Sequence, residues 1–157
     1  MKKIIFLVFV LSFAFSYGQK ILVKYEMLQI HPYCGGAKPP REMEEQARIP
    51  QPYANLTLIY KSAKGKVDSV KTDDKGILLL NLKPGTYHFF ESWKYYKKTP
   101  EGSSFAAYNK TCLEAEWKKE DLKITVTTKG NPIIVNNIST AKCAWNQDCL
   151  LQKHFPE

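Results

Sequence analysis

Hydrophobic and polar side chains alternate along much of the chain with the two-residue period of a half-buried β-strand. In residues 21–30 (ILVKYEMLQI) the first four odd positions are large and apolar, and in residues 122–128 (LKITVTT) apolar side chains alternate with Lys and Thr. Segments with this alternation, or with an apolar run of strand length, lie at 21–30, 55–61, 67–72, 77–82, 86–91, 122–128 and 133–138. The pattern therefore predicts about seven short strands.

Glycine and proline residues separate most of these segments and indicate tight turns between them. Gly65, Gly76 and the pair Pro84-Gly85 each lie between two expected strands, and Gly130-Asn131-Pro132 precedes the last one. Glycine supplies the positive φ that such turns require, and proline presets φ near −65°. Because strands do not alternate with long helices, a parallel sheet is not expected. We expect an all-β fold, an antiparallel β-sandwich.

Two stretches depart from this pattern. Residues 31–54 begin with the Pro/Gly-rich HPYCGGAKPP, which cannot continue a ladder, and residues 41–48 favour one or two helical turns. Residues 139–157 show no regular period, and a further helical pattern, LEAEWKKED, lies at 113–121. We therefore expect an inserted loop and an irregular C-terminal tail attached to a domain that spans residues 19–138.

The N-terminal residues 1–18 (MKKIIFLVFVLSFAFSYG) have the pattern of a secretory signal peptide. Two lysines precede an apolar run, and small residues follow it at the positions that a signal peptidase reads. An N-terminal membrane anchor is the alternative, but the run is shorter than a usual bilayer span. We expect cleavage before Gln19 and export to a periplasm or to the exterior, with no membrane span in the mature chain.

Composition limits the classes of partner. The chain has 157 residues, 44% of them hydrophobic, and a formal net charge of +8, which suits one globular domain. Its lysines are spread from Lys20 to Lys153 and resemble a solvated surface more than a nucleic-acid-binding stripe. We expect no nucleic-acid partner; an envelope or extracellular protein, or a glycan, is expected instead.

Four cysteines follow the expected cleavage site: Cys34, Cys112, Cys143 and Cys149. An even count in an exported chain favours two disulfides, for which three pairings exist. Cys143 and Cys149 are close in sequence, and the residues between them can turn. This spacing favours a Cys143–Cys149 bond, which leaves Cys34 to pair with Cys112. A zinc site is not favoured, since no CxxC or HxxxH spacing is present.

A motif within residues 54–91 resembles a known family. The motif is T-D-x-x-G, an apolar run, and then L-x-P-G-x-Y, and its positions are Thr72, Asp73, Gly76, Leu82, Pro84, Gly85 and Tyr87. This skeleton is similar to that of carboxypeptidase-regulatory-like and transthyretin-like (prealbumin-like) modules, and it covers about 40 residues. The resemblance implies a transthyretin-like β-sandwich, and therefore agrees with the fold expected from the alternation.

The strongest candidate for a ligand-binding site is the aromatic and basic stretch 93–98 (WKYYKK), which follows an expected strand. Trp93, Tyr95 and Tyr96 could stack on a sugar or a peptide, and Lys97 could meet an acidic group. The alternative is that the strand continues here, with the rings in the core and the lysines in solvent.

A weaker candidate is a metal site. His31, Cys34 and Met43 lie within the unusual loop, and a soft His/Cys/Met set suits copper. The competing interpretation is that Cys34 is disulfide-bonded and Met43 packs. We expect no cofactor and no metal, and we keep this site as the alternative.

Catalysis is not favoured. Of the three histidines, His88 lies in an expected strand, and no serine lies in a G-x-S-x-G elbow. The carboxylates gather at 42–45, 73–74 and 120–121, positions that suit a solvated surface. The sequence favours a non-catalytic binding or accessory module of the cell envelope or exterior. Its alternatives are a metal-binding or chaperone-like protein that uses the His31–Met43 loop, and a small secreted hydrolase or inhibitor.

Overall fold

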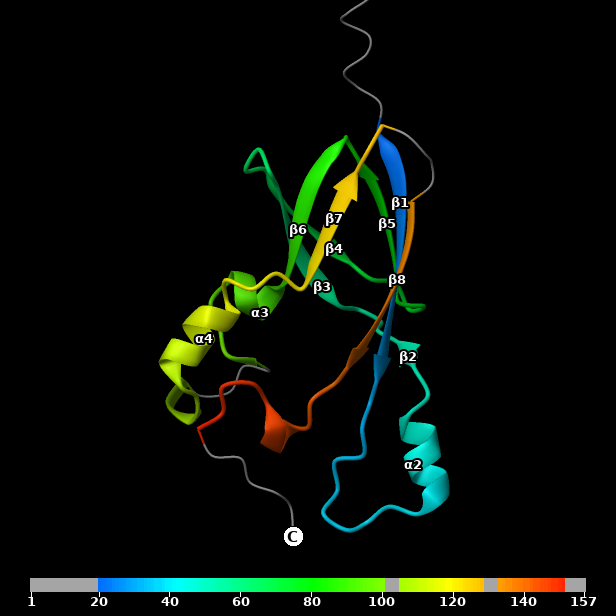
Figure 1. The fold of residues 1–157 in the computed structure, drawn as a ribbon, viewed down its shortest axis with the longest axis vertical. Helices are drawn as coiled ribbons and strands as arrows, with labels where there is room; N and C mark the ends of the chain where they lie inside the picture. The colour runs from blue at the N-terminus through cyan, green and yellow to red at the C-terminus, as the bar shows by residue number, and fades with distance from the viewer. Residues whose placement is uncertain (1–19, 101–104, 129–132, 152–157) are drawn as a thin grey trace, which may run out of the picture.

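A computed structural model describes residues 20–100, 105–128 and 133–151 of the chain. These residues form two four-stranded β-sheets that pack face to face, with the short helices gathered toward one end (Figure 1). The all-β sandwich expected from the alternation is confirmed. The expected signal peptide at 1–18 lies outside the described residues. No helix in the described part of the chain is long and apolar enough to cross a membrane.

The strands and helices follow the sequence pattern closely. In chain order they are β1 (Ile21–Ile30), α2 (Arg41–Ala47), β2 (Gln51–Pro52), β3 (Thr57–Ser62), β4 (Val67–Lys71), β5 (Ile77–Leu82), β6 (Gly85–Glu91), α3 (Ser92–Tyr95), a 3₁₀ turn (Phe105–Ala107), α4 (Lys110–Glu116), β7 (Leu122–Val126), β8 (Ile133–Thr140) and a second 3₁₀ turn (Ala144–Asn146). Each expected strand is present within one or two residues of its expected bounds. The two-residue β2 was not expected, and β8 runs to Thr140, beyond the expected end.

In the first sheet, β1 lies in the centre. It pairs with β5 over its first half and with β2 near its end, both antiparallel, and with β8 in parallel. The second sheet has the order β4-β3-β6-β7, and all of its ladders are antiparallel. The parallel β1–β8 ladder, between the first and the last strand of the chain, has no counterpart in the sequence-based expectation.

This parallel ladder determines the first disulfide. Val23 pairs with Ile133, and the register continues to Ile30 opposite Thr140, so both strands leave the sheet side by side and in the same direction. The cysteines that follow within four residues of the two strand ends, Cys34 and Cys143, are bonded, with their Cα atoms 5.5 Å apart. The expected pairing was therefore wrong, because the ladder brings together cysteines that are 109 residues apart in sequence.

The second disulfide joins Cys112 on α4 to Cys149 in the tail, with a Cα–Cα distance of 5.4 Å. The tail reaches α4 through a bridge between Tyr108 and Leu150 and through a 2.8 Å hydrogen bond from the amide of Asn109 to the carbonyl of Cys149. The expected Cys143–Cys149 bond is therefore absent. Cys143 lies at the end of the first sheet and Cys149 lies beside α4, with the second 3₁₀ turn between them.

The core lies between the two sheets and is formed by the inward side of the alternation. Tyr25 and Leu78 of the first sheet, and Leu58 and Phe89 of the second, have 1% or less of their surface exposed. The remaining buried members of the cluster are Ile21, Val23, Met27, Leu80, Leu82, Tyr87, Ile124 and Val126. Burial of apolar surface on this scale is the main force that holds the sheets together.

Hydrogen bonds from the T-D-x-x-G motif connect the two sheets at one end of the sandwich. The buried Thr72 hydroxyl donates to the carbonyl of Tyr53 (2.7 Å) and accepts from the amide of Leu56 (2.8 Å). The Asp73 carboxylate accepts from two amides of the following turn. Gly76 then passes so close to β1 that its carbonyl accepts from the amide of Met27 at 2.9 Å. Thr72, Asp73 and Gly76 of the motif therefore have a structural reason in this chain.

Candidate functional site

The aromatic and basic stretch does not extend β6 into the core. The chain turns at Ser92 into the short helix α3, and Lys97 then adopts a positive φ of 54°. Trp93 is half-buried, whereas Tyr95 and Tyr96 have 36% and 58% of their surface exposed. Of the four expected binding residues, the two tyrosines and Lys97 are thus on the surface, and Trp93 is half-buried.

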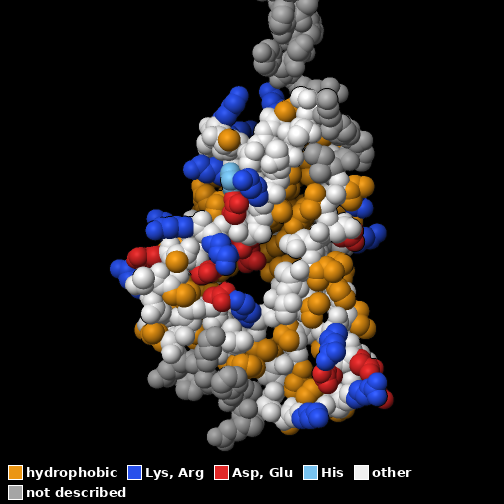
Figure 2. All heavy atoms as spheres, viewed as in Figure 1, with side chains coloured by type: hydrophobic (Ala, Val, Ile, Leu, Met, Phe, Trp, Pro, Cys, Tyr) orange, Lys and Arg blue, Asp and Glu red, His pale blue; other side chains and the backbone are white. Residues whose placement is uncertain are grey.

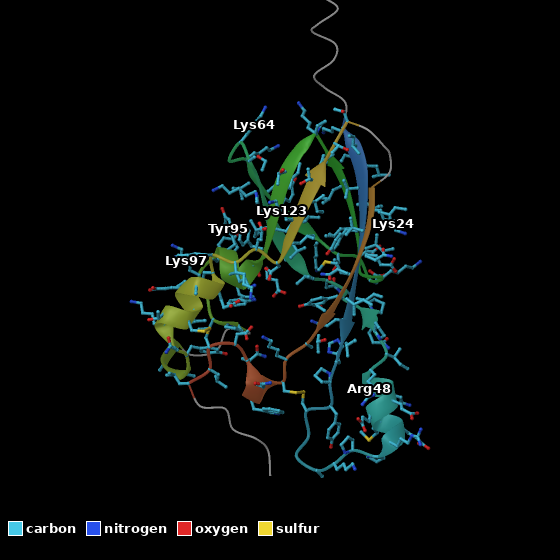
Figure 3. The ribbon with its side chains drawn as sticks, viewed as in Figure 1. Lys24, Arg48, Lys64, Tyr95, Lys97 and Lys123 are labelled. Atoms are coloured by element: carbon cyan, nitrogen blue, oxygen red, sulfur yellow. A yellow bond between two sulfur atoms is a disulfide. The ribbon has the colours of Figure 1, made fainter. Side chains whose placement is uncertain are left out.

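The two tyrosines form an exposed pair at the end of α3, which we call the tyrosine tip. The ring centroids of Tyr95 and Tyr96 are 5.3 Å apart and the rings are perpendicular. The ammonium of Lys98 lies 5.9 Å from the centroid of the Tyr96 ring, within the range of a cation–π contact. Tyr95 and Lys97 lie on the same side of the molecule (Figure 3). The arrangement offers a partner two aromatic faces beside positive charge.

A buried lysine anchors the tip from below. Lys94 has only 8% of its surface exposed, and its ammonium forms ion pairs with Asp121, which precedes β7, and with Glu116 at the end of α4 (3.9 Å). It also lies 5.5 Å from the centroid of the Trp93 ring. Burying a charge is costly unless it is paired, so the two carboxylates fix where Lys94, and hence α3, can lie.

Two further contacts hold the backbone of the tip. The indole N–H of Trp117 donates to the carbonyl of Lys98 (2.8 Å), and the amide of Lys98 donates to the carbonyl of Trp93 (2.8 Å). The indole N–H of Trp93 donates to Glu91 Oε2 at 2.9 Å. The segment is therefore fixed at both ends, by Trp117, which follows α4, and by Glu91 of β6. Sequence reasoning did not identify Lys94 as buried, because its acidic partners lie more than 20 residues away along the chain.

The Glu91 carboxyl titrates unusually in this setting. Burial raises its pKa above the usual value near 4.5, the nearby Asp121 carboxylate raises the pKa further, and the hydrogen bond from Trp93 and the charge of Lys94 lower it. A group whose pKa is raised on folding binds protons more tightly in the folded state. Its contribution to the free energy of unfolding is therefore greatest below pH 4.5, and it is lost as the pH rises through the pKa that Glu91 has in the folded protein.

We expect Glu91→Gln to remove this loss. The glutamine oxygen can still accept from Trp93, while no charge is buried beside Asp121. The difference in free energy of unfolding between variant and wild type should therefore shift in favour of the variant as the pH rises from 4.5 through the folded pKa. Urea unfolding at a series of pH values measures it. A difference that is constant with pH would show that Glu91 titrates as it does in the unfolded chain.

The residues of the metal alternative lie around one cavity, and the cysteine among them is disulfide-bonded. His31, Cys34 and Met43 line one shallow cavity of about 390 Å³ between the end of β1 and α2. Because the sulfur of Cys34 is bonded to Cys143, it is not a thiolate ligand. No group of three His, Cys, Asp or Glu side chains in the described ranges is arranged to hold a metal ion.

His88 lies on the outer face of the second sheet. Its Nδ1 pairs with the carboxylate of Glu120, and both side chains are about one-third exposed. His88 lines neither the cavity between β1 and α2 nor the cavity between the β3–β4 and β5–β6 turns. This contact lies on the open face of the sheet.

The outer face of the first sheet carries an apolar surface. Leu79, Ile134 and Ile138 have 64%, 62% and 57% of their surface exposed, and Leu22 has 40%. Lys24 of β1 pairs with Leu79 on one side and Ile134 on the other, so these side chains share one face. Hydrophobic side chains gather over β8 and its neighbour β1 (Figure 2). Contiguous exposed apolar area of this kind is typical of contact surfaces.

A larger cavity, of about 1020 Å³, lies at the end of the sandwich away from the helices. It is bordered by the β3–β4 turn and the β5–β6 turn, and four lysines lie in its wall: Lys20, Lys64, Lys66 and Lys83. Sequence reasoning assigned these lysines to a solvated surface. The signal that could have found them is that both turns carry lysines and adjoin the same end of the paired strands.

Comparisons with known proteins do not place the chain in a family. No family model matches the sequence. No curated protein matches it either. Among solved structures, it is similar to the Bacillus anthracis TIE protein, with 18% identity, a TM-score of 0.36 and coverage of 75% of this chain. The chain spans 16% of the length of that protein, and a likeness this weak supports no conclusion about fold or function.

Proposed function

We propose that this chain is an exported, non-catalytic binding module that contacts an envelope or extracellular partner, a protein or a glycan, through the tyrosine tip. The observation that carries the proposal is the exposure of two adjacent tyrosine rings on a backbone that is fixed from beneath. Tyr96 is 58% exposed, although moving an aromatic ring of this size out of water is favourable.

Rigid exposed tyrosines are well suited to recognition. Their rings supply large contact area at a small cost in side-chain entropy, and their hydroxyls can form hydrogen bonds at the edge of a contact. Contacts at Lys94 and Lys98 already hold the backbone of the tip in place. Binding therefore costs little further conformational entropy, and more of the contact free energy contributes to affinity. Lys97 and Lys98 beside the rings favour a partner with acidic groups.

Export is supported by independent features. Residues 1–18 have the pattern of a signal peptide, and two disulfides are the form that cysteines take in an oxidising compartment. The motif at 72–87 and the two-sheet architecture support a transthyretin-like module as the scaffold. Together these features favour a small accessory domain of the periplasm or exterior.

The test uses the mature protein as bait in envelope extracts. We expect Tyr95→Ala with Tyr96→Ala to reduce the captured partner about tenfold or more, since exposed aromatic anchors commonly contribute 1–2 kcal/mol or more, roughly, to an interface. The thermal unfolding midpoint should stay within about 2 °C, because exposed side chains contribute little to stability.

The apolar face provides the matched control. Leu79→Ser with Ile134→Ser removes two exposed apolar side chains from the outer face of the first sheet. If the partner is lost with this pair of substitutions and kept with the tyrosine pair, the tip is not the contact site. Equal capture by all three proteins would show that neither surface is used.

A further inference from the structure

The large cavity at the lysine-bearing end of the sandwich holds an excess of positive charge. Lys64 and Lys66 come from the β3–β4 turn, Lys83 from the β5–β6 turn and Lys20 from the residue before β1. The one acidic side chain in the wall is Asp68, whose carboxylate accepts from the Tyr60 hydroxyl (3.4 Å) and from the amide of Ser69 (2.9 Å). Four charges of one sign thus face a single carboxylate.

None of these four lysines forms a salt bridge within the described part of the chain. The ion pairs found there involve Arg41, Arg48, His88, Lys94, Lys119 and Lys142, all of which lie elsewhere. Unneutralised charges around a concave, partly apolar wall focus the electrostatic potential into the cavity and raise the local concentration of anions. Lysine side chains gather at this end of the molecule, and Lys64 lies at the tip of the β3–β4 turn (Figures 2 and 3).

Neutral polar groups lie in the wall between the lysines. They are the side chains of Ser62, Asn81, Thr86 and Thr128. The Ser62 hydroxyl accepts from the amide of Lys66 at 3.1 Å, so its own hydrogen remains available to donate to a ligand. Hydroxyl and amide groups set among positive charges match a ligand that carries both hydroxyls and acidic groups.

The turns that frame the cavity are held in place. The amide of Ala63 donates to the carbonyl of Thr86 (3.1 Å), which ties the β3–β4 turn to β6. The hydroxyl of Tyr87 donates to the carbonyl of Lys83 at 2.9 Å, which fixes the β5–β6 turn. The lysines therefore project from a preformed frame, and the ring of the half-buried Tyr60 provides an apolar wall.

We propose that this cavity binds an acidic glycan, a sugar chain whose carboxylate, sulfate or phosphate groups pair with Lys64, Lys66 and Lys83 while its hydroxyls bond to the neutral side chains between them. The site lies at the opposite end of the sandwich from the tyrosine tip (Figure 3), so it is a second binding site beyond the proposed function. A volume of about 1020 Å³ is large enough for two or three sugar rings.

The experiment is titration calorimetry of the mature protein with three probes at low salt. Tetragalacturonate carries sugar hydroxyls and carboxylates, maltotetraose has the hydroxyls alone, and tripolyphosphate has the charge alone. We expect tetragalacturonate to bind at least about tenfold more tightly than either of the others, and its affinity to fall as salt rises. Equal binding of maltotetraose would overturn the role of charge, and equal binding of tripolyphosphate would overturn the role of the sugar.

Matched variants test the location. Lys64→Gln, Lys66→Gln and Lys83→Gln together should weaken tetragalacturonate about tenfold or more. The control triple, Lys75→Gln, Lys110→Gln and Lys118→Gln, removes the same charge from exposed positions outside the cavity wall and should change affinity less than about twofold. Equal weakening by both triples would show that only net charge matters.

A second measurement avoids dependence on the variants. In the wild-type protein, tetragalacturonate should shift the amide resonances of residues 62–66 and of Lys83, Gly85 and Thr86 more than those of the tyrosine tip. Shifts centred on Tyr95 and Tyr96 instead would overturn the assignment of the glycan to the cavity, while leaving the tip as a binding surface.

Discussion

Replacing Gly76 by alanine is expected to lower the free energy of unfolding by about 3 kcal/mol or more. A Cβ atom at this position would lie 2.3 Å from the carbonyl oxygen of Met27 and 3.0 Å from the amide nitrogen of Tyr53. Both are backbone atoms of elements that the turn holds together, so neither can move aside cheaply. The φ of +72° adds the cost of a left-handed conformation. Urea unfolding with constant slope measures the change.

Gly65 is the matched control. Its φ is +82°, but a Cβ there would meet nothing within 4 Å. Gly65→Ala should therefore show the conformational cost alone, about 1–2 kcal/mol. If the two variants lose equal stability, Gly76 does not lie against the Met27 carbonyl, and the T-D-x-x-G motif does not join the two sheets.

Removal of the disulfide that follows the parallel ladder is expected to have a similarly large effect. The Cys34–Cys143 bond closes a separation of 109 residues, and its loss through Cys34→Ser with Cys143→Ser should cost about 4–5 kcal/mol by the loop-entropy model. The same change at Cys112 and Cys149, where the separation is 37, should cost about 1 kcal/mol less. Denaturant midpoints of both double variants measure the difference.

Non-reducing peptide mapping of the wild-type protein tests the pairing directly. A peptide pair containing Cys34 and Cys143, together with one containing Cys112 and Cys149, is expected. A Cys143–Cys149 peptide in the oxidised, folded protein would contradict the pairing, and with it the parallel register of β1 and β8.

The strands could be predicted from sequence because their signal is local. Alternation at 21–30 and at 122–128 reports which side chains face the core, and that pattern needs only neighbouring residues. Gly76 and Pro84-Gly85 likewise mark turns by their own backbone preferences. These features were enough for the sandwich, since two sheets that each have an apolar face must bury those faces against each other.

The pairing of strands and cysteines could not be predicted in the same way. The apolar pattern of residues 133–138 does not indicate whether this segment pairs with 21–30 or with 122–128. The short separation of Cys143 and Cys149 favoured a local bond, but the parallel ladder carries Cys143 to Cys34 instead. Long-range contacts of this kind depend on the sum of many packing choices and leave no local signature.

The candidate site was predicted in part. The exposed rings of Tyr95 and Tyr96 lie in the stretch that composition indicated, whereas Trp93 is half-buried and donates to Glu91, and Lys94 is buried in ion pairs. A buried lysine cannot be told from a solvated one without its partners, and Glu116 and Asp121 approach it only when α4 and β7 fold against α3. The lysines of the cavity were missed for the same reason, because they come from three separate segments.

The Cys34–Cys143 bond also decides how the molecule would respond to mechanical tension between its two ends. A pull from the N-terminal side travels along β1 to Cys34, crosses the sulfur bridge to Cys143 and continues into the tail. The sandwich strands β2 to β8 lie outside this load path, so tension cannot extend the chain between the two cysteines while the bond is intact. Reduction of both disulfides would release about 380 Å of extensible chain between Cys34 and Cys143, given a separation of 109 residues and about 3.5 Å per residue. The oxidised protein is therefore a short tether under load, and the reduced protein a long one.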